Sequence, residues 1–264
     1  AMSSTYPNLG IVDNVKQLTP FAFNLGIYAG DRTDFIQIVG ARHILSSNYI
    51  INCFTQLQED SATWCVGGKI ENEYVNEVGE VISRAMETTF GMGLGNFRTL
   101  EKSGFTDTVT SPMYPYWVFD KIGFFDEELI RNQDDDFNYR VNSEGGKIFY
   151  DNGISLKYYV RGNFKGLWRQ FFQYGYWKVY VNKKHKAITT LRQLVPPAFA
   201  LYLTLLIPIS FLGKTLFLVS VIPLGVYLML NVTFSLKAIP SIGKLPHTLI
   251  TFPILHISYG LGYL

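Results

Sequence analysis

Apolar positions change their spacing along the chain, and short apolar runs alternate with helical patterns up to about residue 160. The alternation predicts strands over residues 9–12, 35–39, 64–70, 147–151 and 154–160. Helical spacing predicts helices over residues 19–29, 47–58, 75–88, 118–124 and 132–143. Alternating strands and helices are typical of an α/β fold with a largely parallel sheet.

The C-terminal region contains three runs without a charged side chain. Arg192 and Lys214 bracket 21 uncharged residues, and Lys214 and Lys237 bracket another 22. A helix needs about 20 apolar residues to cross the hydrocarbon core, so we predict membrane spans over about 193–213 and 215–236. A buried core hairpin is the alternative for these two runs. The third run, 246–264, contains prolines, glycines and histidines and fits a spanning or an interfacial helix equally.

Charge is distributed unevenly as well. All 21 acidic residues and eleven of the 23 basic ones lie at or before Asp151, so residues 1–151 carry a net charge of −10. Residues 152–264 carry twelve Lys and Arg and no acid. The basic excess before the first span predicts that residues 1–190 are cytoplasmic, and it would attract anionic lipid headgroups.

Residues 164–182 mix eight aromatic side chains with Lys and Arg. This mixture suits a helix that lies in the headgroup plane; a helix packed on the soluble domain is the alternative. We therefore divide the chain into a domain over 1–160, a basic aromatic interfacial segment over 161–190 and a transmembrane region over 191–264.

Composition excludes several classes of protein. An aromatic content of 16% excludes a disordered chain, and two cysteines exclude a disulfide-stapled scaffold. The sequence shows no metal-ligand spacing and no nucleophilic serine elbow. A channel or transporter is disfavoured because the apolar runs contain no charged group. We expect no nucleic-acid partner.

The densest candidate chemistry is the run from Asn132 to Arg140, which contains Asp134, Asp135 and Asp136 at the start of a predicted helix. One of these carboxylates would act as a general base toward an acceptor hydroxyl. The structural alternative is an acidic first turn, favoured by the helix dipole, with an ion pair between Asp136 and Arg140.

Two weaker candidates lie elsewhere. Gly91, Gly93 and Gly95 would cradle phosphate through backbone N–H groups, although a plain flexible loop is favoured. Arg42 and His43 follow the predicted strand over 35–39, at the end where α/β folds bind ligands; a solvated turn fits equally.

The stretch 119–140 resembles family 2 glycosyltransferases, particularly bacterial polysaccharide enzymes of the succinoglycan-biosynthesis type. Supporting matches cover residues 66–72, 145–148, 170–178, 191–197 and 256–262. The resemblance implies a GT-A domain, which has a Rossmann-like fold. It also implies inverting sugar transfer from a UDP- or GDP-sugar to a lipid-linked or polysaccharide acceptor. The enzyme would be a multi-pass protein of the inner or plasma membrane that builds cell-surface polysaccharide.

The resemblance also assigns residues. The family's Glu-Asp pair falls on Gln133 and Asp134, which implies that Asp134 is the base and that Asp135, Asp136 and Arg140 support it. The family's Gln-x-x-Arg motif, which precedes an aromatic residue and contacts the donor diphosphate, falls on Gln170, Gln173 and Tyr174.

Three departures from the family pattern stand out. Residues 8–14 match a later family segment, so we expect a GT-A domain without its first strands. The carboxylates that usually hold Mg²⁺ or Mn²⁺ fall on Gly40 and Arg42, so we expect no metal ligand there and expect Arg42 to neutralise phosphate. Gln173 replaces an arginine. These losses favour an alternative function, a non-catalytic scaffold or regulatory subunit of a polysaccharide assembly complex; an inert fragment of an active enzyme is a third.

Overall fold

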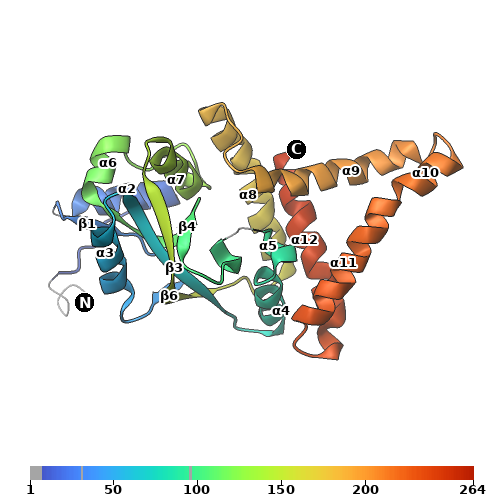
Figure 1. The fold of residues 1–264 in the computed structure, drawn as a ribbon, viewed down its shortest axis with the longest axis horizontal. Helices are drawn as coiled ribbons and strands as arrows, with labels where there is room; N and C mark the ends of the chain where they lie inside the picture. The colour runs from blue at the N-terminus through green and yellow to red at the C-terminus, as the bar shows by residue number, and fades with distance from the viewer. Residues whose placement is uncertain (1–7, 31, 95–96) are drawn as a thin grey trace. The chain divides into compact units, whose positions relative to one another are not determined.

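The computed structural model describes residues 8–30, 32–94 and 97–264, and the chain forms two compact units (Figure 1). The first unit comprises residues 1–69 and 102–156, and the second comprises residues 70–101 and 157–264. Residues 70–101 therefore group with the C-terminal helices rather than with the sequence on either side of them.

A mixed sheet forms the centre of the first unit. Its strands, in order across the sheet, are β1 (Phe35–Gln37), β5 (Thr110–Pro115), β3 (Thr63–Glu73), β6 (Lys147–Tyr159) and β2 (His43–Leu45), and β4 (Gly104–Thr106) pairs with β6. β5 is antiparallel to both β1 and β3, so β1 and β3 run in the same direction. The pair β4–β6 is antiparallel as well. The expectation of a largely parallel sheet is wrong for these three pairs, chiefly because β5 is inserted between β1 and β3.

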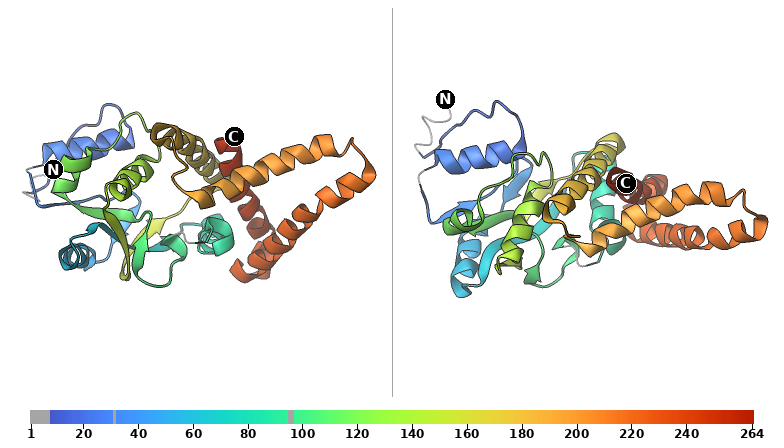
Figure 2. Two further views of the ribbon diagram at one scale, coloured as in Figure 1. Left: turned by 45° about the horizontal axis from the view of Figure 1, so that its top comes forward. Right: turned by 90° about the horizontal axis from the view of Figure 1, so that it is seen from above.

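The helices of the first unit are α2 (Thr19–Ala29), α3 (Tyr49–Glu59), α6 (Tyr116–Ile122) and α7 (Gln133–Ser143). All four were predicted from helical spacing and begin within two residues of the predicted positions. α3 lies on one side of the sheet and α2 and α7 on the other (Figure 2). Buried aromatic rings join α7 to the sheet and to the segment after α6; the Phe137 ring lies 5.0 Å from that of Tyr114 and 4.6 Å from that of Phe125.

Several predicted strands are corrected by the structure. Residues 9–12 form no strand and stay exposed, with Ile11 at 76% exposure, because these apolar side chains find no sheet partner. The two strands predicted over 147–151 and 154–160 are the single strand β6. The Asn152-Gly153 pair signals a turn in the sequence, but the strand continues through it.

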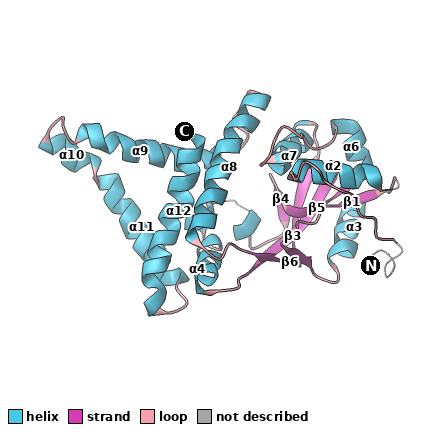
Figure 3. Ribbon diagram, turned by 180° about the vertical axis from the view of Figure 1, so that it is seen from behind, coloured by secondary structure: helices cyan, strands magenta, loops and turns pink. Residues whose placement is uncertain are grey.

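The second unit is helical. Its elements are α4 (Glu77–Met86), α5 (Thr89–Met92), η1 (Phe97–Thr99), α8 (Phe164–His185), η2 (Leu191–Leu194), α9 (Val195–Ile209), α10 (Lys214–Ser220), α11 (Ile222–Ala238), η3 (Ile242–Lys244) and α12 (Leu245–Tyr263) (Figure 3). α8 and α12 approach so closely that only glycine fits at the contact. A Cβ atom on Gly175 would lie 2.0 Å from the Tyr259 carbonyl oxygen, and one on Gly262 would lie 2.0 Å from that of Phe172.

Two helical stretches of the described residues, Leu191–Ile209 and Lys214–Ala238, are long and apolar enough to cross a membrane. Only 17% and 6% of them, respectively, is buried, and large apolar side chains such as Phe211 (85% exposed) and Met229 (62% exposed) face outward. This exposure contradicts the alternative of a buried core hairpin and indicates a membrane protein. α12 instead packs against α8 and α9.

Candidate active site

The three carboxylates of the acidic cluster separate when α7 forms. Successive helix residues point about 100° apart, so Asp136 turns into the core while Asp134 is exposed and Asp135 is half-buried. α7 begins directly after Asn132, which has a φ of 59°, a left-handed conformation that asparagine tolerates better than most residues. Of the three carboxylates, Asp134 is the one presented to solvent.

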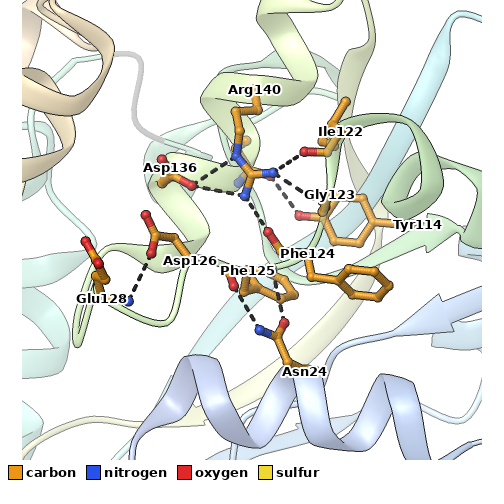
Figure 4. A network of polar contacts seen from close by, with 11 residues as sticks. Asn24, Tyr114, Ile122, Gly123, Phe124, Phe125, Asp126, Glu128, Asp136 and Arg140 are labelled. Atoms are coloured by element: carbon orange, nitrogen blue, oxygen red, sulfur yellow. Dashed lines mark hydrogen bonds and ion pairs between the residues drawn. The ribbon is translucent and has the colours of Figure 1, made fainter.

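Asp136 forms the predicted ion pair with Arg140 (Figure 4). Its Oδ2 atom accepts a hydrogen bond from Arg140 Nε at 3.1 Å and lies 3.0 Å from Nη2 in the ion pair. The guanidinium also donates to the carbonyl oxygens of Ile122 at 2.5 Å, Gly123 at 3.4 Å and Phe124 at 2.8 Å. The pair therefore ties α7 to the loop that follows α6.

Two further contacts fix this region. In α2, Asn24 donates to the Phe125 carbonyl oxygen at 2.8 Å and accepts the Phe125 N–H at 3.0 Å (Figure 4). In β5, the Tyr114 hydroxyl donates to Asn138 Oδ1 at 2.7 Å. Burial, and then the neighbouring Cys65 thiol and Asp134 charge, raise the pKa of Tyr114 well above its usual value, so this phenol stays neutral. Asp134 therefore projects from a helix that is tied to β5 and to the loop after α6, and α2 holds that loop in turn.

The turn after β1 holds the other candidates of the first unit, Arg42 and His43. Arg42 is half-buried. His43 Nδ1 lies 2.7 Å from Ser111 Oγ and accepts the Gly40 N–H at 3.3 Å. A Cβ atom on Gly40 would lie 2.9 Å from His43 Cε1, so a carboxylate at this position would displace the ring. Among the described residues, no group of three His, Cys, Asp or Glu is arranged to hold a metal ion. The residues of this turn do not fit a divalent cation.

The support beneath this turn carries no signal in the sequence. Ser111 has a φ of 43°, a strained value for a serine, and such strain is concentrated at functional sites. The Tyr49 hydroxyl donates to the carbonyl oxygens of Thr110 and Ser111 at 3.1 and 3.0 Å, and Gln37 Nε2 donates to that of Ser111 at 2.7 Å. No motif marks Ser111, because its conformation depends on distant residues.

The glycine-rich segment is a short helix where the structure describes it. Gly91 and Gly93 belong to α5 and its C-terminal end, and Gly95 lies outside the described residues. The Gly91 N–H donates to Thr88 Oγ1 at 3.0 Å and the Gly93 N–H to the Thr89 carbonyl oxygen at 2.9 Å. These two N–H groups are therefore engaged inside the chain, which corrects both the phosphate-cradle and the flexible-loop predictions for them.

Gln170, Gln173 and Tyr174 lie on α8 in the second unit. Gln170 is buried and donates through Nε2 to the Tyr174 hydroxyl at 2.9 Å. Gln173 and Tyr174 are half-buried. The structure thus joins Gln170 with Tyr174 directly, as it joins Asp136 with Arg140 in the first unit.

No family model matches the chain. The sequence is 25% identical over 227 residues to the succinoglycan biosynthesis protein ExoA of Rhizobium meliloti (strain 1021). The aligned region covers 84% of this chain and 66% of that protein. It is 26% identical over 174 residues to the dolichyl N-acetyl-α-D-glucosaminyl phosphate 3-β-D-2,3-diacetamido-2,3-dideoxy-β-D-glucuronosyltransferase of Methanococcus voltae. This aligned region covers 64% of this chain and 54% of that enzyme.

This chain resembles polysaccharide glycosyltransferases. The resemblance predicted from residues 119–140 is confirmed, and the mixed α/β sheet with two apolar helices fits a glycosyltransferase fold. The chain spans 66% and 54% of the lengths of the two relatives.

Proposed function

We propose that the protein is a membrane-bound, inverting glycosyltransferase that moves a sugar from a UDP- or GDP-sugar to a lipid-linked acceptor in cell-surface polysaccharide synthesis. The position of Asp134 carries this proposal, because an exposed carboxylate stands on a helix that the buried Asp136–Arg140 pair holds in place. The similarity to the two relatives supports the reaction class. The name of the archaeal relative specifies a dolichyl-linked acceptor, which supports a lipid-linked acceptor here.

In the proposed reaction, Asp134 accepts the proton of the acceptor hydroxyl while the hydroxyl oxygen attacks the anomeric carbon. The bond from that carbon to the donor diphosphate breaks, and the nucleoside diphosphate leaves with the electron pair. A single displacement of this kind inverts the anomeric configuration. A positioned general base contributes about 10²- to 10⁴-fold to such a step. Arg42 is proposed to offset the charge of the leaving diphosphate.

The two apolar helices support a location in the inner or plasma membrane. We infer that the sheet-containing unit is cytoplasmic, because the basic residues 152–192 precede the first apolar helix and attract that end of the helix to the cytoplasmic side. Membrane lipid and the partners of a polysaccharide assembly complex are the expected contacts.

A second candidate function, a non-catalytic scaffold, is favoured by the lack of a carboxylate at Gly40 and of an arginine at Gln173. The experiment that separates the two uses membranes from cells that express the chain, incubated with radiolabelled UDP- and GDP-sugars, with Mn²⁺ or with EDTA. We expect label in the organic-solvent extract above that of vector-only membranes. A correctly inserted chain that transfers label from none of these donors would overturn the proposed function and favour the scaffold.

A further inference from the structure

An arginine and a buried glutamine meet in the second unit beside the start of α8. Arg161 lies between β6 and α8, and its Nε donates to Gln170 Oε1 at 3.3 Å. Gln170 Nε2 donates to the hydroxyls of Tyr174 at 2.9 Å and Tyr158 at 3.4 Å. A second arginine, Arg98 of η1, lies over the Tyr158 ring with its Cζ atom 5.0 Å from the ring centroid.

The hydrogen bonds of Gln170 assign it a positioning role. A guanidinium only donates hydrogen bonds, so the amide oxygen of Gln170 must face Arg161. The amide nitrogen then faces the two tyrosines, and both of its N–H groups have partners. Gln170 is 9% exposed and has little surface left for a substrate. It orients Arg161, whose side chain is exposed.

Backbone contacts fix Arg161 from both sides. The preceding residue, Val160, donates its N–H to the Glu73 carbonyl oxygen at 3.0 Å, and Asn76 donates to the carbonyl oxygen of the following residue, Gly162, at 3.0 Å. Asn163 then caps α8 by accepting the Gly166 N–H at 2.7 Å. The first turn of α8 contains no acid, so the positive end of the helix dipole adds to the charge of Arg161.

Three carboxylates of the second unit are engaged by lysines rather than by Arg161. No acid follows Asp151 in the sequence. Among the described residues of the second unit, Glu73 pairs with Lys157, and Glu77 and Glu80 pair with Lys244. No described carboxylate pairs with Arg161. The site therefore offers the exposed guanidinium of Arg161, whose Nε is bonded to the buried Gln170 amide. That bond directs the two Nη groups, and a guanidinium held in this way is suited to bind a phosphate.

We propose that Arg161, assisted by Arg98, binds the diphosphate of a substrate, and that Gln170 is the positioning residue of Arg161. This inference rests on the proposed function. Arg161 would supply the positive charge that an arginine at position 173 would otherwise provide. The diphosphate belongs either to the nucleotide donor or to the lipid-linked acceptor, and the recognition chemistry is the same for both.

The test measures the dissociation constants of UDP, GDP and farnesyl diphosphate for the full chain in detergent micelles. The variants are Arg161→Gln, Arg161→Lys, Arg98→Gln and Gln170→Leu, and the matched control is Arg169→Gln, which removes an exposed arginine from α8. We expect Arg161→Gln to weaken binding at least about tenfold, as the loss of a charge-assisted hydrogen bond does. Arg161→Lys retains the charge and should weaken binding less, and the control should change it less than twofold.

The positioning role of Gln170 has its own readout. Gln170→Leu should weaken binding in the wild-type background and add little in the Arg161→Gln background, because the two changes remove one interaction. Full additivity would overturn this role. An effect confined to UDP and GDP would assign the site to the donor, and an effect confined to farnesyl diphosphate would assign it to the acceptor.

The failures of the two proposals are distinguishable. If wild type and Arg161→Gln bind the probes with equal dissociation constants, the phosphate role of Arg161 is overturned. The proposed function is then left standing. A wild-type chain that binds none of the three probes would overturn both. Gel filtration and circular dichroism of each variant establish that the compared chains are folded, and Arg161→Lys provides the comparison should Arg161→Gln fail that check.

Discussion

Replacing Arg140 by methionine should destabilise the first unit more than replacing its partner Asp136 by asparagine. The variant removes the Arg140 cation from beside the Asp136 side chain, which is 0% exposed, and breaking a buried ion pair in this way costs about 3–5 kcal/mol. Asp136→Asn leaves a guanidinium that is 18% exposed and still bonded to three carbonyl oxygens. Replacing the carboxylate should cost about 1.5–3 kcal/mol of stability, the range for a hydrogen bond to a charged group.

The two cysteines of the chain provide the assay. Cys53 and Cys65 lie in the first unit, are free and are 0% exposed. Burial, and then the nearby charge of Asp151, raise the pKa of the Cys53 thiol to about 12, so a thiol reagent reacts mainly through opening of this unit. A change of 1.4 kcal/mol alters an opening equilibrium tenfold. We therefore expect Arg140→Met to speed labelling about 140- to 4,000-fold and Asp136→Asn about 10- to 140-fold.

A matched control comes from the same unit. Arg32 pairs with Asp120 at the surface, where the two side chains are 71% and 44% exposed, and an exposed pair contributes about 0–1 kcal/mol. Arg32→Met should therefore change the labelling rate less than about fivefold. Labelling of Arg140→Met at the rate of Asp136→Asn or below would refute the reasoning, because it would show that the buried Asp136 carboxylate does not depend on Arg140.

Three further predictions concern the second unit. Gly262→Ala should lower the thermal midpoint in detergent by an amount corresponding to about 1–3 kcal/mol of overpacking. Gly225→Ala is the control and should leave the midpoint unchanged, because no atom lies within 4 Å of a Cβ atom there. Equal midpoints for the two variants would contradict the close contact of α8 and α12. The hydrogen bond from Lys244 lowers the pKa of Glu80, so its contribution to stability is present above the ordinary pKa of 4.5 and is lost as the pH falls through the lowered value. On acidification the thermal midpoint of wild type should therefore fall further than that of Glu80→Gln. Thermal midpoints that fall in parallel with pH would exclude this contribution. A reporter fused at Lys214 should be non-cytoplasmic, and a cytoplasmic reading would reverse the proposed orientation.

Local signals made the helices of the first unit predictable. Thr19-Pro20 starts α2 because proline is preorganised for the first helical turn, and the Asp136–Arg140 pair follows from i,i+4 spacing. The strand β5 escaped prediction because Pro112 and Pro115 are typical strand breakers. Its pairing with β1 and β3 arises from residues far apart in the sequence.

The candidate site was predictable only in part, for the same reason. The carboxylate cluster is local, and helical geometry then distinguishes exposed Asp134 from buried Asp136. Three other features depend on the folded chain: the carbonyl oxygens that accept hydrogen bonds from Arg140, the strained backbone of Ser111, and the contact between Arg161 and Gln170. Arg161 has no motif in the sequence, and its candidate role emerges only when its neighbours in space are known.

The most direct test of the central claim measures sugar transfer and donor binding together for Asp134→Asn. Its matched control is Glu144→Gln, which removes an exposed carboxylate just beyond the C-terminal end of the same helix. We expect Asp134→Asn to bind the nucleotide within about twofold of wild type and to lose at least about 10²-fold in transfer rate, while Glu144→Gln retains both. Transfer by Asp134→Asn at the wild-type rate would contradict the assignment of Asp134 as the base.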